Sequence, residues 1–371
     1  MRFGFTTEQL DLRDSVRRFL DRLTDKAADG SALPLEPGTS AWTVLSEQLG
    51  LTALTVPEEF GGFGTGTVEL AVVLEEMGRH PRPGPFLASS GFAVPPLTAL
   101  LGKEDARRYL PDVSAGRLLA TLAAADGAGV EVRAQERRSE YALTGVTPPV
   151  HAVPGLFVVT AASAHGPRLF LVSPDAAGWS LVPEASFDLT APVARLRLED
   201  APATLLGEVG DEDTIRRALV RARISLAASQ LGGAQACLDT AVAYAKDRRQ
   251  FGRPIGSFQA VKHRLADVLV AIEGARSLVY HAAWLADRDD EAELRTVAAM
   301  AKAWCSDAYL QAAETNVLVH GGLGFTWEHS AHLHLRRARS QHTLLGHPDQ
   351  QLDEVAARLG LGSAAVAHGK A

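Results

Sequence analysis

Apolar residues recur along the chain with two different periods, and the period changes twice. Up to about residue 117 they stand three or four positions apart, as on one face of an amphipathic helix. Between Leu118 and Leu206, short apolar runs alternate with Gly, Pro and Asp, which indicates strands joined by turns. From Asp213 onward the helical period returns, so we expect a mostly α chain with a central β module. The helices expected in this last part cover about 214–248, 258–287, 291–319 and 350–359.

The first helix has a clear beginning. Thr6 stands three residues before Gln9, the spacing of a capping box in which each side chain bonds the other residue's backbone amide. A polar stretch with Gly and Pro follows at 25–39, and a second helix is expected over 42–49, where Gly50 ends it. The buried stripe of the first helix is predicted to consist of Leu12, Val16, Phe19, Leu20 and Leu23.

A glycine-rich segment at 61–64, Gly-Gly-Phe-Gly, follows Val56 and Pro57. Such segments bind phosphate when a clear strand precedes them and a Gly-Lys-Ser/Thr follows, and this sequence provides neither. A tight surface turn is therefore the better interpretation.

Two long helices flank a cationic corner. The first helix ends in basic residues, which suit the negative end of its dipole, and Gly and Pro then end it. With Gln250 and Phe251 beside the guanidiniums, this corner could hold a diphosphate and stack on a base. The simpler alternative is an ordinary helix turn with solvated arginines, since basic helix C-termini are common. The basic residues are Lys246, Arg248 and Arg249, and the helix-ending residues are Gly252, Pro254 and Gly256.

The flanking helices are predicted from their apolar faces, with Ala filling many of the positions between. The face of the first consists of Leu219, Leu226, Leu231, Leu238 and Val242, and that of the second of Val261, Leu265, Val268, Leu269 and Ile272.

Composition excludes several classes of protein. With 371 residues, 22% of them charged, and a net charge of −7, the chain has no basic field for nucleic acid. We find no apolar run of membrane-spanning length and no signal-peptide pattern in the first residues. Cys237 and Cys305 fall in helical patterns and offer no disulfide framework, so a reducing cytoplasm is the simplest expected location.

The cationic corner and the helix after it resemble the signature of the acyl-CoA dehydrogenase family. Segments at 56–62, 74–78 and 109–116 are also typical of the N-terminal helical domain of that family. The resemblance thus covers nearly the whole chain. Its signature reads Arg248-x-Gln250-Phe251-Gly252-x-Pro254-Ile255-x-x-Phe258-Gln259-Ala260-x-x-x-x-Leu265-Ala266-Asp267.

The resemblance implies an architecture and a set of partners. It implies an N-terminal helical domain over 1–117, a middle β-barrel over 118–210 and a C-terminal four-helix bundle over 211–371. It also implies FAD, an acyl-CoA substrate, a dimer of dimers and reoxidation by an electron-transfer flavoprotein. In this family each FAD lies at a subunit interface, with its ring in one chain and its adenosine end touched by the next.

The expected catalytic base is missing. Desaturating an acyl thioester needs a carboxylate on one face of the acyl chain and a flavin on the other, and a Glu in a dry pocket suits this role. The family places that Glu in the loop after its His-Gly-Gly segment or on the first long helix before an Arg. These positions carry Leu345 and Ala222 here, so no catalytic residue is assigned. His347 and Asp349 are candidates for a relocated base, and Arg223 is expected to line the acyl-CoA pocket.

The family resemblance assigns contacts to the adenosine diphosphate half of FAD. These are Arg248, Gln250 and Phe251, together with Gly321 and Gly322, where glycine lets backbone amides approach phosphate closely.

The side that would face the flavin ring departs further from the family pattern. The usual Thr-Glu-Pro-Gly-x-Gly-Ser-Asp is reduced to Ala-Asp-Gly-Ala-Gly-Val-Glu at 125–131, and an aromatic and hydroxyl pair falls within Thr147-Pro148-Pro149-Val150. A proline cannot donate the hydrogen bond that a flavin edge needs. On the adenosine diphosphate side the one departure is Leu318, where the family usually has a Gln. We therefore expect the chain to hold the tail of a partner's FAD better than the ring of its own.

A hetero-oligomer could divide these roles between a subunit with ring pocket and base and a subunit with tail contacts. The family includes such two-gene enzymes for bulky acyl-CoAs such as steroid side chains, and the segments 321–329 and 333–337 resemble that subgroup. Two alternatives stay open. One is an autonomous flavoenzyme with a relocated base, and the other is a flavin-free scaffold or an enzyme of the same fold with different chemistry.

Three histidines, His329, His332 and His334, stand close together in the sequence. His329 and His332 would share a helix face, but no carboxylate or cysteine set completes a group of metal ligands. We therefore expect structural or solvated histidines and assign no metal site. Glu328 is typical of the family and does not stand where the base belongs.

Overall fold

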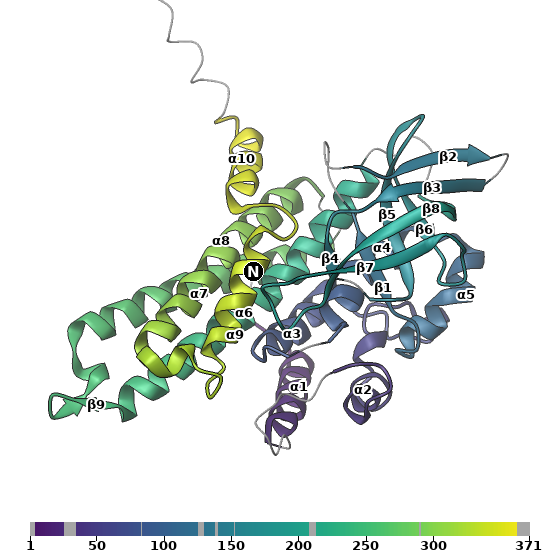
Figure 1. Cartoon of the computed structure of the whole chain (residues 1–371). Coiled ribbons are helices and arrows are strands. Elements are labelled where there is room, and N and C mark those ends of the chain that lie inside the picture. Colours follow the sequence, from purple (N-terminus) through teal and green to yellow (C-terminus); the bar gives the residue numbers. More distant parts are fainter. Residues whose placement is uncertain are drawn as a thin grey trace, which may run out of the picture. The chain divides into compact units, whose positions relative to one another are not determined.

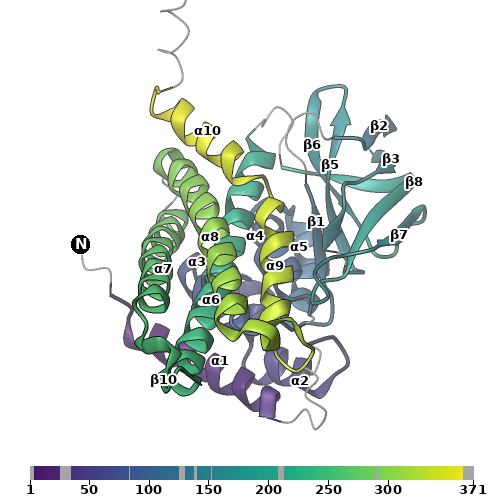
Figure 2. The same cartoon turned by 60° about the vertical axis from the view of Figure 1, so that its left-hand side comes forward.

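The chain folds into two compact units, which are described separately (Figures 1 and 2). The first unit comprises Met1–Val73 and Arg82–Ser225, and the second comprises Leu74–Pro81 and Leu226–Ala371. The computed structural model describes residues 4–25, 35–82, 84–124, 130–137, 140–151, 153–207, 213–288 and 291–361.

Helices form the beginning of the first unit, as the spacing of its apolar residues predicts. The predicted capping box opens α1 (Thr7–Asp25), because Gln9 N donates to Thr6 Oγ1 at 3.3 Å and Thr6 N donates to Gln9 Oε1 at 3.0 Å. The predicted stripe of α1 is buried, except that Leu12 is half-buried. The elements that follow are α2 (Ser40–Thr43), η1 (Val44–Gln48), η2 (Leu51–Ala53), η3 (Glu58–Phe60), α3 (Thr67–Gly78), η4 (Leu87–Ala93), α4 (Val94–Leu100) and α5 (Lys103–Ser114).

The glycine-rich segment at 61–64 is a tight turn, as predicted. Gly61 has a φ of 81°, and a Cβ on Gly62 would lie 1.9 Å from the carbonyl oxygen of Val56. Glycine is therefore required at both positions for the backbone to fold back on itself.

A closed β-barrel completes the first unit, as the alternating pattern predicts. Strands β5, β2, β3, β8 and β6 pair in a ring, since β6 pairs with both β5 and β8. In β5, Phe157, Val159 and Ala161 point into the barrel core at alternate positions. The strands are β1 (Ala120–Ala123), β2 (Arg133–Arg137), β3 (Glu140–Val146), β4 (Val150–His151), β5 (Leu156–Ser163), β6 (Gly166–Val172), β7 (Trp179–Glu184) and β8 (Val193–Leu206).

Long helices form the second unit. In it, α8 packs against α7, α9 and α10. The first helix, α6, belongs to the first unit up to Ser225 and to the second unit from Leu226. None of the helices in the described part of the chain is both long and apolar enough to span a membrane. The helices are α6 (Thr214–Asp247), α7 (Gln259–Ala286), α8 (Glu291–His320), α9 (Ala331–Thr343) and α10 (Pro348–Arg358).

These helices match the predicted ranges, with two differences. The expected set lacked α9, because that helix is rich in Arg and His and has few apolar residues. Leu269 was placed on the buried face of α7, but its side chain is 46% exposed, whereas Val268 and Ile272 are buried. Neighbouring positions point about 100° apart on a helix, so Val268 and Leu269 cannot both face the core fully.

Glycines let the last turn of α3 cross α6 closely within the second unit. A Cβ on Gly78 would lie 2.0 Å from the carbonyl oxygen of Ser229, and one on Gly232 would lie 1.7 Å from that of Glu75. The buried Glu75 carboxylate there accepts hydrogen bonds from Arg276 and from the Tyr280 hydroxyl, both on α7. This ion pair joins α3 to α7, and Arg276 also donates to Gln235 Oε1 on α6 at 2.9 Å.

The mostly α fold with a central β-barrel is thus confirmed. The three-domain division at 117 and 210 stays a prediction.

Candidate functional site

The cationic corner is a two-stranded hairpin between α6 and α7. In it β9 (Arg249–Gln250) pairs antiparallel with β10 (Arg253–Pro254). The two residues between them, Phe251 and Gly252, have φ values of 52° and 79°. Positive φ at both positions is the requirement of a type I′ turn, which suits Gly but costs about 1–2 kcal/mol for a bulky residue.

This strained turn presents the ring of Phe251 to solvent. Its side chain is 92% exposed, and its ring meets that of Phe258 edge to face at 6.2 Å. The base of the hairpin is closed by Ile255 N, which donates to the carbonyl oxygen of Arg248 at 2.8 Å. Arg248 and Gln250 are exposed beside the ring. The hairpin therefore exposes a guanidinium, an amide and an aromatic ring side by side.

The second part of the site is the glycine turn η7 (Gly321–Phe325), which follows α8 directly. Gly321 has a φ of 59°, and a Cβ on Gly321 or Gly322 would meet no atom within 4 Å. Gly324, in contrast, is packed, because a Cβ there would lie 2.9 Å from the carbonyl oxygen of Val317. The first two glycines thus leave open space over the backbone, where a phosphate can approach amides closely.

Aromatic contacts bring the hairpin and the glycine turn to the same end of the second unit. Tyr244, in the last turn of α6, lies against His320, the last residue of α8, with ring centroids 4.2 Å apart. Gln230 and Ser306, about four turns earlier on the same helices, are also in contact at 3.2 Å. The two helices therefore run parallel and end together, which Figure 2 shows near β10.

The groups gathered at this end fit the adenosine diphosphate half of FAD. A guanidinium pairs well with a diphosphate, an exposed aromatic ring stacks on an adenine, and glycines without a Cβ leave room for a phosphate close to the backbone. All five residues that the sequence assigned to this half lie here: Arg248, Gln250, Phe251, Gly321 and Gly322.

The segment at 147–150 does not fit the flavin ring. Thr147 is buried, and its Oγ1 accepts a hydrogen bond from Leu196 N at 3.0 Å, so the hydroxyl is engaged within the sheet. Pro148 and Pro149, which follow, have no N–H to donate. The other segment of the expected ring side falls largely on 125–129, which lie outside the described residues.

Both positions where a Glu would act as base are apolar in the structure. Ala222 is fully buried on α6, and Arg223 beside it is 7% exposed and takes part in interactions within the protein. Leu345 is half-buried in the turn between α9 and α10, with a φ of 60°. A left-handed Leu is strained, and such strain is typical of functional turns.

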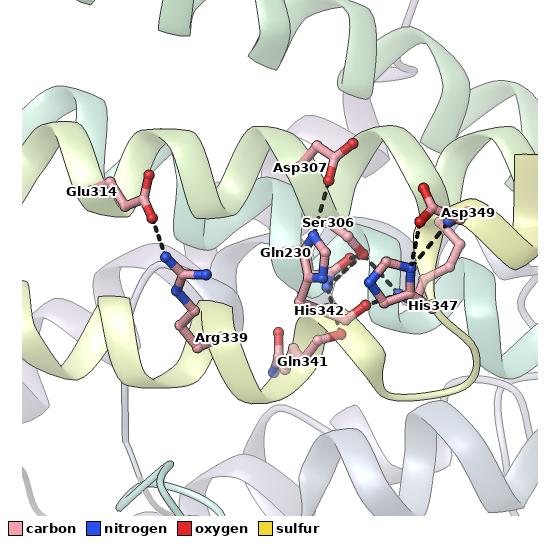
Figure 3. Close-up of polar contacts among 10 residues, drawn as sticks. Gln230, Ser306, Asp307, Glu314, Arg339, Gln341, His342, His347 and Asp349 are labelled. Carbon is pink, nitrogen blue, oxygen red and sulfur yellow. Dashed lines mark hydrogen bonds and ion pairs between the residues drawn. The ribbon is translucent and has the colours of Figure 1, made fainter.

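The two candidates for a relocated base cap a helix instead (Figure 3). His347 is the N-cap of α10, and its Nδ1 accepts from Asp349 N at 3.3 Å. Gln350 Oε1 accepts in return from His347 N at 3.0 Å, which completes a capping box. The Asp349 carboxylate is 83% exposed, so it lacks the dry pocket expected around the base.

A buried polar network fixes the start of the turn that carries Leu345. Lys302 is fully buried, and its Nζ donates to Ser306 Oγ at 2.7 Å and to the carbonyl oxygen of His342 at 3.0 Å. Gln230 donates to the neighbouring carbonyl of Gln341 at 3.2 Å (Figure 3). These carbonyls end α9, where intrahelical donors are lacking, so the network caps that helix from within the bundle.

The network of Lys302, Ser306 and Gln230 was not predicted from the sequence. Its signal is a Lys and a Ser four positions apart, Lys302 and Ser306, on an otherwise alanine-rich helix. That spacing places both side chains on one face.

The three clustered histidines have separate surroundings. His329 precedes α9, so the prediction that it shares a helix face with His332 is wrong. His334 is buried and joined to the Tyr309 hydroxyl by a hydrogen bond of 2.9 Å, and burial lowers its pKa to about 3. Within the described ranges, no group of three or more His, Cys, Asp or Glu is arranged to hold a metal ion.

Neither cysteine is suited to chemistry. Cys237 and Cys305 are both buried, and burial raises the pKa of each thiol. A thiol that stays protonated is a poor nucleophile.

The chain matches two family models. One is described as acyl-CoA dehydrogenase, C-terminal domain, and matches residues 213–360, and the other as acyl-CoA dehydrogenase, N-terminal domain, and matches residues 6–117. The relative named acyl-CoA dehydrogenase IpdE2, of Mycobacterium tuberculosis, is 34% identical over 347 residues, which cover 93% of this chain and 95% of the relative.

Solved structures are similar over almost the whole fold. The ChsE4-ChsE5 complex from Mycobacterium tuberculosis matches with a TM-score of 0.86 and 28% identity, over 97% of this chain and 99% of that chain. The Tcur3481-Tcur3483 steroid ACAD matches with a TM-score of 0.84 and 29% identity, over 96% of this chain and 99% of that chain.

Proposed function

The chain belongs to the acyl-CoA dehydrogenase family, and from this premise we propose that it is one of two unlike subunits of an FAD-dependent acyl-CoA dehydrogenase. In this proposal it binds the adenosine diphosphate end of an FAD whose ring lies in a partner chain. The partner also supplies the catalytic base.

The observation that carries the proposal is the absence of a carboxylate at both base positions, which Ala222 and Leu345 occupy. A chain with either residue as Glu could act alone, whereas this one needs another proton acceptor for α,β-desaturation. The tail contacts are intact in sequence and exposed in the structure. The combination supports a division of labour between two chains.

The contribution of this chain is to bind and orient. FAD, when bound, supplies the acceptor for the hydride that leaves the β-carbon of the acyl thioester. The Arg248 guanidinium neutralises diphosphate charge, the Phe251 ring stacks on the adenine, and the amides at Gly321 and Gly322 donate to phosphate oxygens. Arg223 lines the acyl-CoA pocket in this proposal, as the resemblance implies.

The named relatives support a hetero-oligomer that acts on a bulky acyl-CoA. One solved structure is a complex of two differently named chains, and another is named a steroid ACAD with two chain names. We extend to this chain both the assembly from two unlike chains and the action on a bulky acyl-CoA. We also propose a dimer of dimers as the assembly and an electron-transfer flavoprotein as the oxidant. The three domains at 1–117, 118–210 and 211–371 belong to the same proposal.

The surroundings of His347 and Asp349 weigh against an autonomous enzyme with a relocated base. His347 Nδ1 accepts a hydrogen bond from Asp349 N at 3.3 Å and lies 3.4 Å from the Asp349 carboxylate. Moving the His347 side chain toward a substrate would leave Asp349 N, one of the first amides of α10, without this acceptor.

Co-expression tests the proposal. This chain is purified with each candidate acyl-CoA dehydrogenase-like partner, and flavin content and bleaching by acyl-CoAs are measured. We expect one pairing to give a yellow complex that bulky acyl-CoAs bleach, and an Arg248→Gln chain in that pairing to retain less flavin. A complex that forms but holds as much flavin with Arg248→Gln would overturn the assignment of the tail contacts.

A further inference from the structure

We infer that a column of three stacked rings, Tyr244, His320 and His329, sets the separation between the hairpin and the glycine turn, and does so only while His329 is neutral. The inference rests on the proposed function, since these two parts are the proposed adenosine diphosphate site. The three residues are positioning residues, which act through the groups that touch the ligand.

The column connects three elements in the second unit. The His320 ring lies 4.2 Å from that of Tyr244 and 4.1 Å from that of His329, with interplanar angles of 31° and 35°. Tyr244 belongs to the last turn of α6, His320 ends α8, and His329 precedes α9. Rings at these centroid distances are in direct contact, so the elements cannot approach or separate without breaking the column.

Two residues of the column, Tyr244 and His320, are attached directly to the proposed site. Arg248 N donates to the carbonyl oxygen of Tyr244 at 2.8 Å, which fixes the base of the hairpin to the first ring. Gly321 is the residue immediately after His320, so the glycine turn starts at the middle ring. The column therefore determines how far the Arg248 guanidinium lies from the glycine amides.

Hydrogen bonds define the protonation of the two histidines. His320 Nδ1 lies 2.8 Å from the carbonyl oxygen of Asn316, and a carbonyl only accepts, so this nitrogen carries a proton. His329 Nδ1 accepts from Ala331 N at 3.1 Å, so this nitrogen carries none. Ala331 begins α9, and its amide is one of those that the helix itself cannot satisfy.

Protonation of His329 would break this arrangement in two ways. A proton on Nδ1 removes the acceptor for Ala331 N and places a positive charge at the positive end of the α9 dipole. It also sets that charge against the His320 ring.

The groups around His329 already oppose the charge. Burial lowers the pKa of His329, and His320 from α8 and His332 from α9 lower it further. Burial and Arg336 also lower the pKa of His332, so this neighbour is neutral as well at neutral pH. Tyr244, from α6, completes the set of titratable groups in the column.

Acidification should loosen the column of rings. The column is intact at neutral pH, where His329 has no charge, and it loosens as the pH falls below the ordinary range of histidine. Affinity for an adenosine diphosphate group should therefore fall on acidification. A histidine that touched the diphosphate itself would have the opposite effect, because its charge would attract phosphate.

The experiment uses the purified full chain with ADP as the probe. Calorimetry at about pH 7.5 and about pH 5.0 should show the affinity of the wild type falling at least about twofold further than that of His329→Asn, whose smaller decrease reports the protonation of ADP itself. Asn keeps an oxygen that accepts from Ala331 N and does not titrate. The control His165→Asn, at an exposed turn of the barrel, should keep the wild-type pH dependence. A tighter complex at acid pH would overturn the inference.

A second set of variants tests the stack itself. Tyr244→Leu should weaken ADP binding at both pH values, and Tyr244→Phe, which keeps the ring, should restore it. Both variants remove the hydroxyl, but only Tyr244→Leu removes the aromatic ring. Equal loss of ADP affinity in the two variants would therefore contradict a role for the ring.

Amide exchange measured by NMR on the same chain separates the column from the proposed function. Protonation of His329 should speed exchange at Gly322 and Ala331 in the wild type, beyond the intrinsic pH effect seen in His329→Asn. If exchange behaves so while ADP does not bind, the column stands and the assigned binding site fails. If His329 titrates with no change at these amides, the column is refuted whatever ADP does.

Discussion

Arg248 is the residue on which the proposed FAD contact depends most at the scale of single side chains. A hydrogen bond from a guanidinium to phosphate contributes about 1.5–3 kcal/mol, so Arg248→Gln should weaken FAD or ADP binding by about 10- to 100-fold. Arg249→Gln is the matched control, because it removes the same charge from the next position of the same exposed hairpin. Titration calorimetry measures both. Equal losses would mean that the hairpin attracts the ligand only through its overall charge.

His334 gives a prediction on stability as a function of pH. Burial lowers its pKa to about 3 from 6.5, so the folded protein keeps it neutral while the unfolded chain takes up a proton below about pH 6.5. The unfolded state thus binds more protons, and this contribution to stability is complete above pH 6.5 and declines as the pH falls towards 3. Within that window, each unit by which the pH falls lowers the free energy of unfolding by about 1.4 kcal/mol.

Urea unfolding of the wild type and of His334→Gln checks this contribution. Between about pH 7 and about pH 5 the wild type should lose roughly 1–2 kcal/mol more than the variant. His165→Asn, on the exposed turn, serves as control and should follow the wild type. Parallel curves for wild type and His334→Gln would show that His334 does not titrate as its burial requires.

At the scale of elements, the hairpin between α6 and α7 has a strained backbone at Phe251 and exposes the ring of that residue to solvent. Phe251 stands at a left-handed position where Asn is favoured, and Asn before Gly252 would form the preferred type I′ turn. Phe251→Asn should therefore stabilise the protein by about 1 kcal/mol, since the ring is 92% exposed and little burial is lost. The same change should weaken FAD binding by about tenfold, because stacking on a base is worth about 1–3 kcal/mol.

Urea unfolding and ligand titration together measure this exchange of stability for affinity. Val270→Asn, at a 71% exposed position on α7, is a control that should leave the hairpin unchanged. If Phe251→Asn stabilised the protein and left the affinity for FAD unchanged, Phe251 would not be a contact of the proposed site.

The network under the Leu345 turn is the second element with a measurable role. Lys302→Met would leave the carbonyl of His342 without its buried donor and would remove one of two donors to the Ser306 hydroxyl, at a cost of about 1–3 kcal/mol. Hydrogen exchange should also become faster over 343–347. Lys262→Met, at an exposed position on α7, should change neither quantity. Unchanged exchange in Lys302→Met would show that the turn is held by other contacts.

Local sequence rules predicted the elements well where one signal dominates. The Thr6 and Gln9 pair gave the start of α1, and long apolar repeats gave α6, α7 and α8 within a few residues. They missed α9, because its stability comes from the bundle around it and from a buried lysine on another helix. Contacts between distant segments of this kind leave no local pattern.

At the scale of the whole molecule, the chain combines an intact family fold with a site that is assigned only in part. The resemblance named five tail contacts, and the structure gathers these residues at one end of the second unit. Sequence could not indicate the turn conformation of Phe251 or the ring column, because both depend on backbone angles and on contacts between helices. The absence of a carboxylate at the two positions that the resemblance gives for the base, in contrast, follows from the identities of residues 222 and 345.

The central claim is that this chain lacks the acid–base half of the reaction and depends on a partner. The most direct measurement is the flavin content and acyl-CoA dehydrogenase activity of the chain purified alone, compared with the chain purified with its partner. The account predicts little flavin and no bleaching by acyl-CoA for the chain alone, and both in the complex. A homo-oligomer that carried one FAD in each subunit and desaturated an acyl-CoA unaided would contradict it.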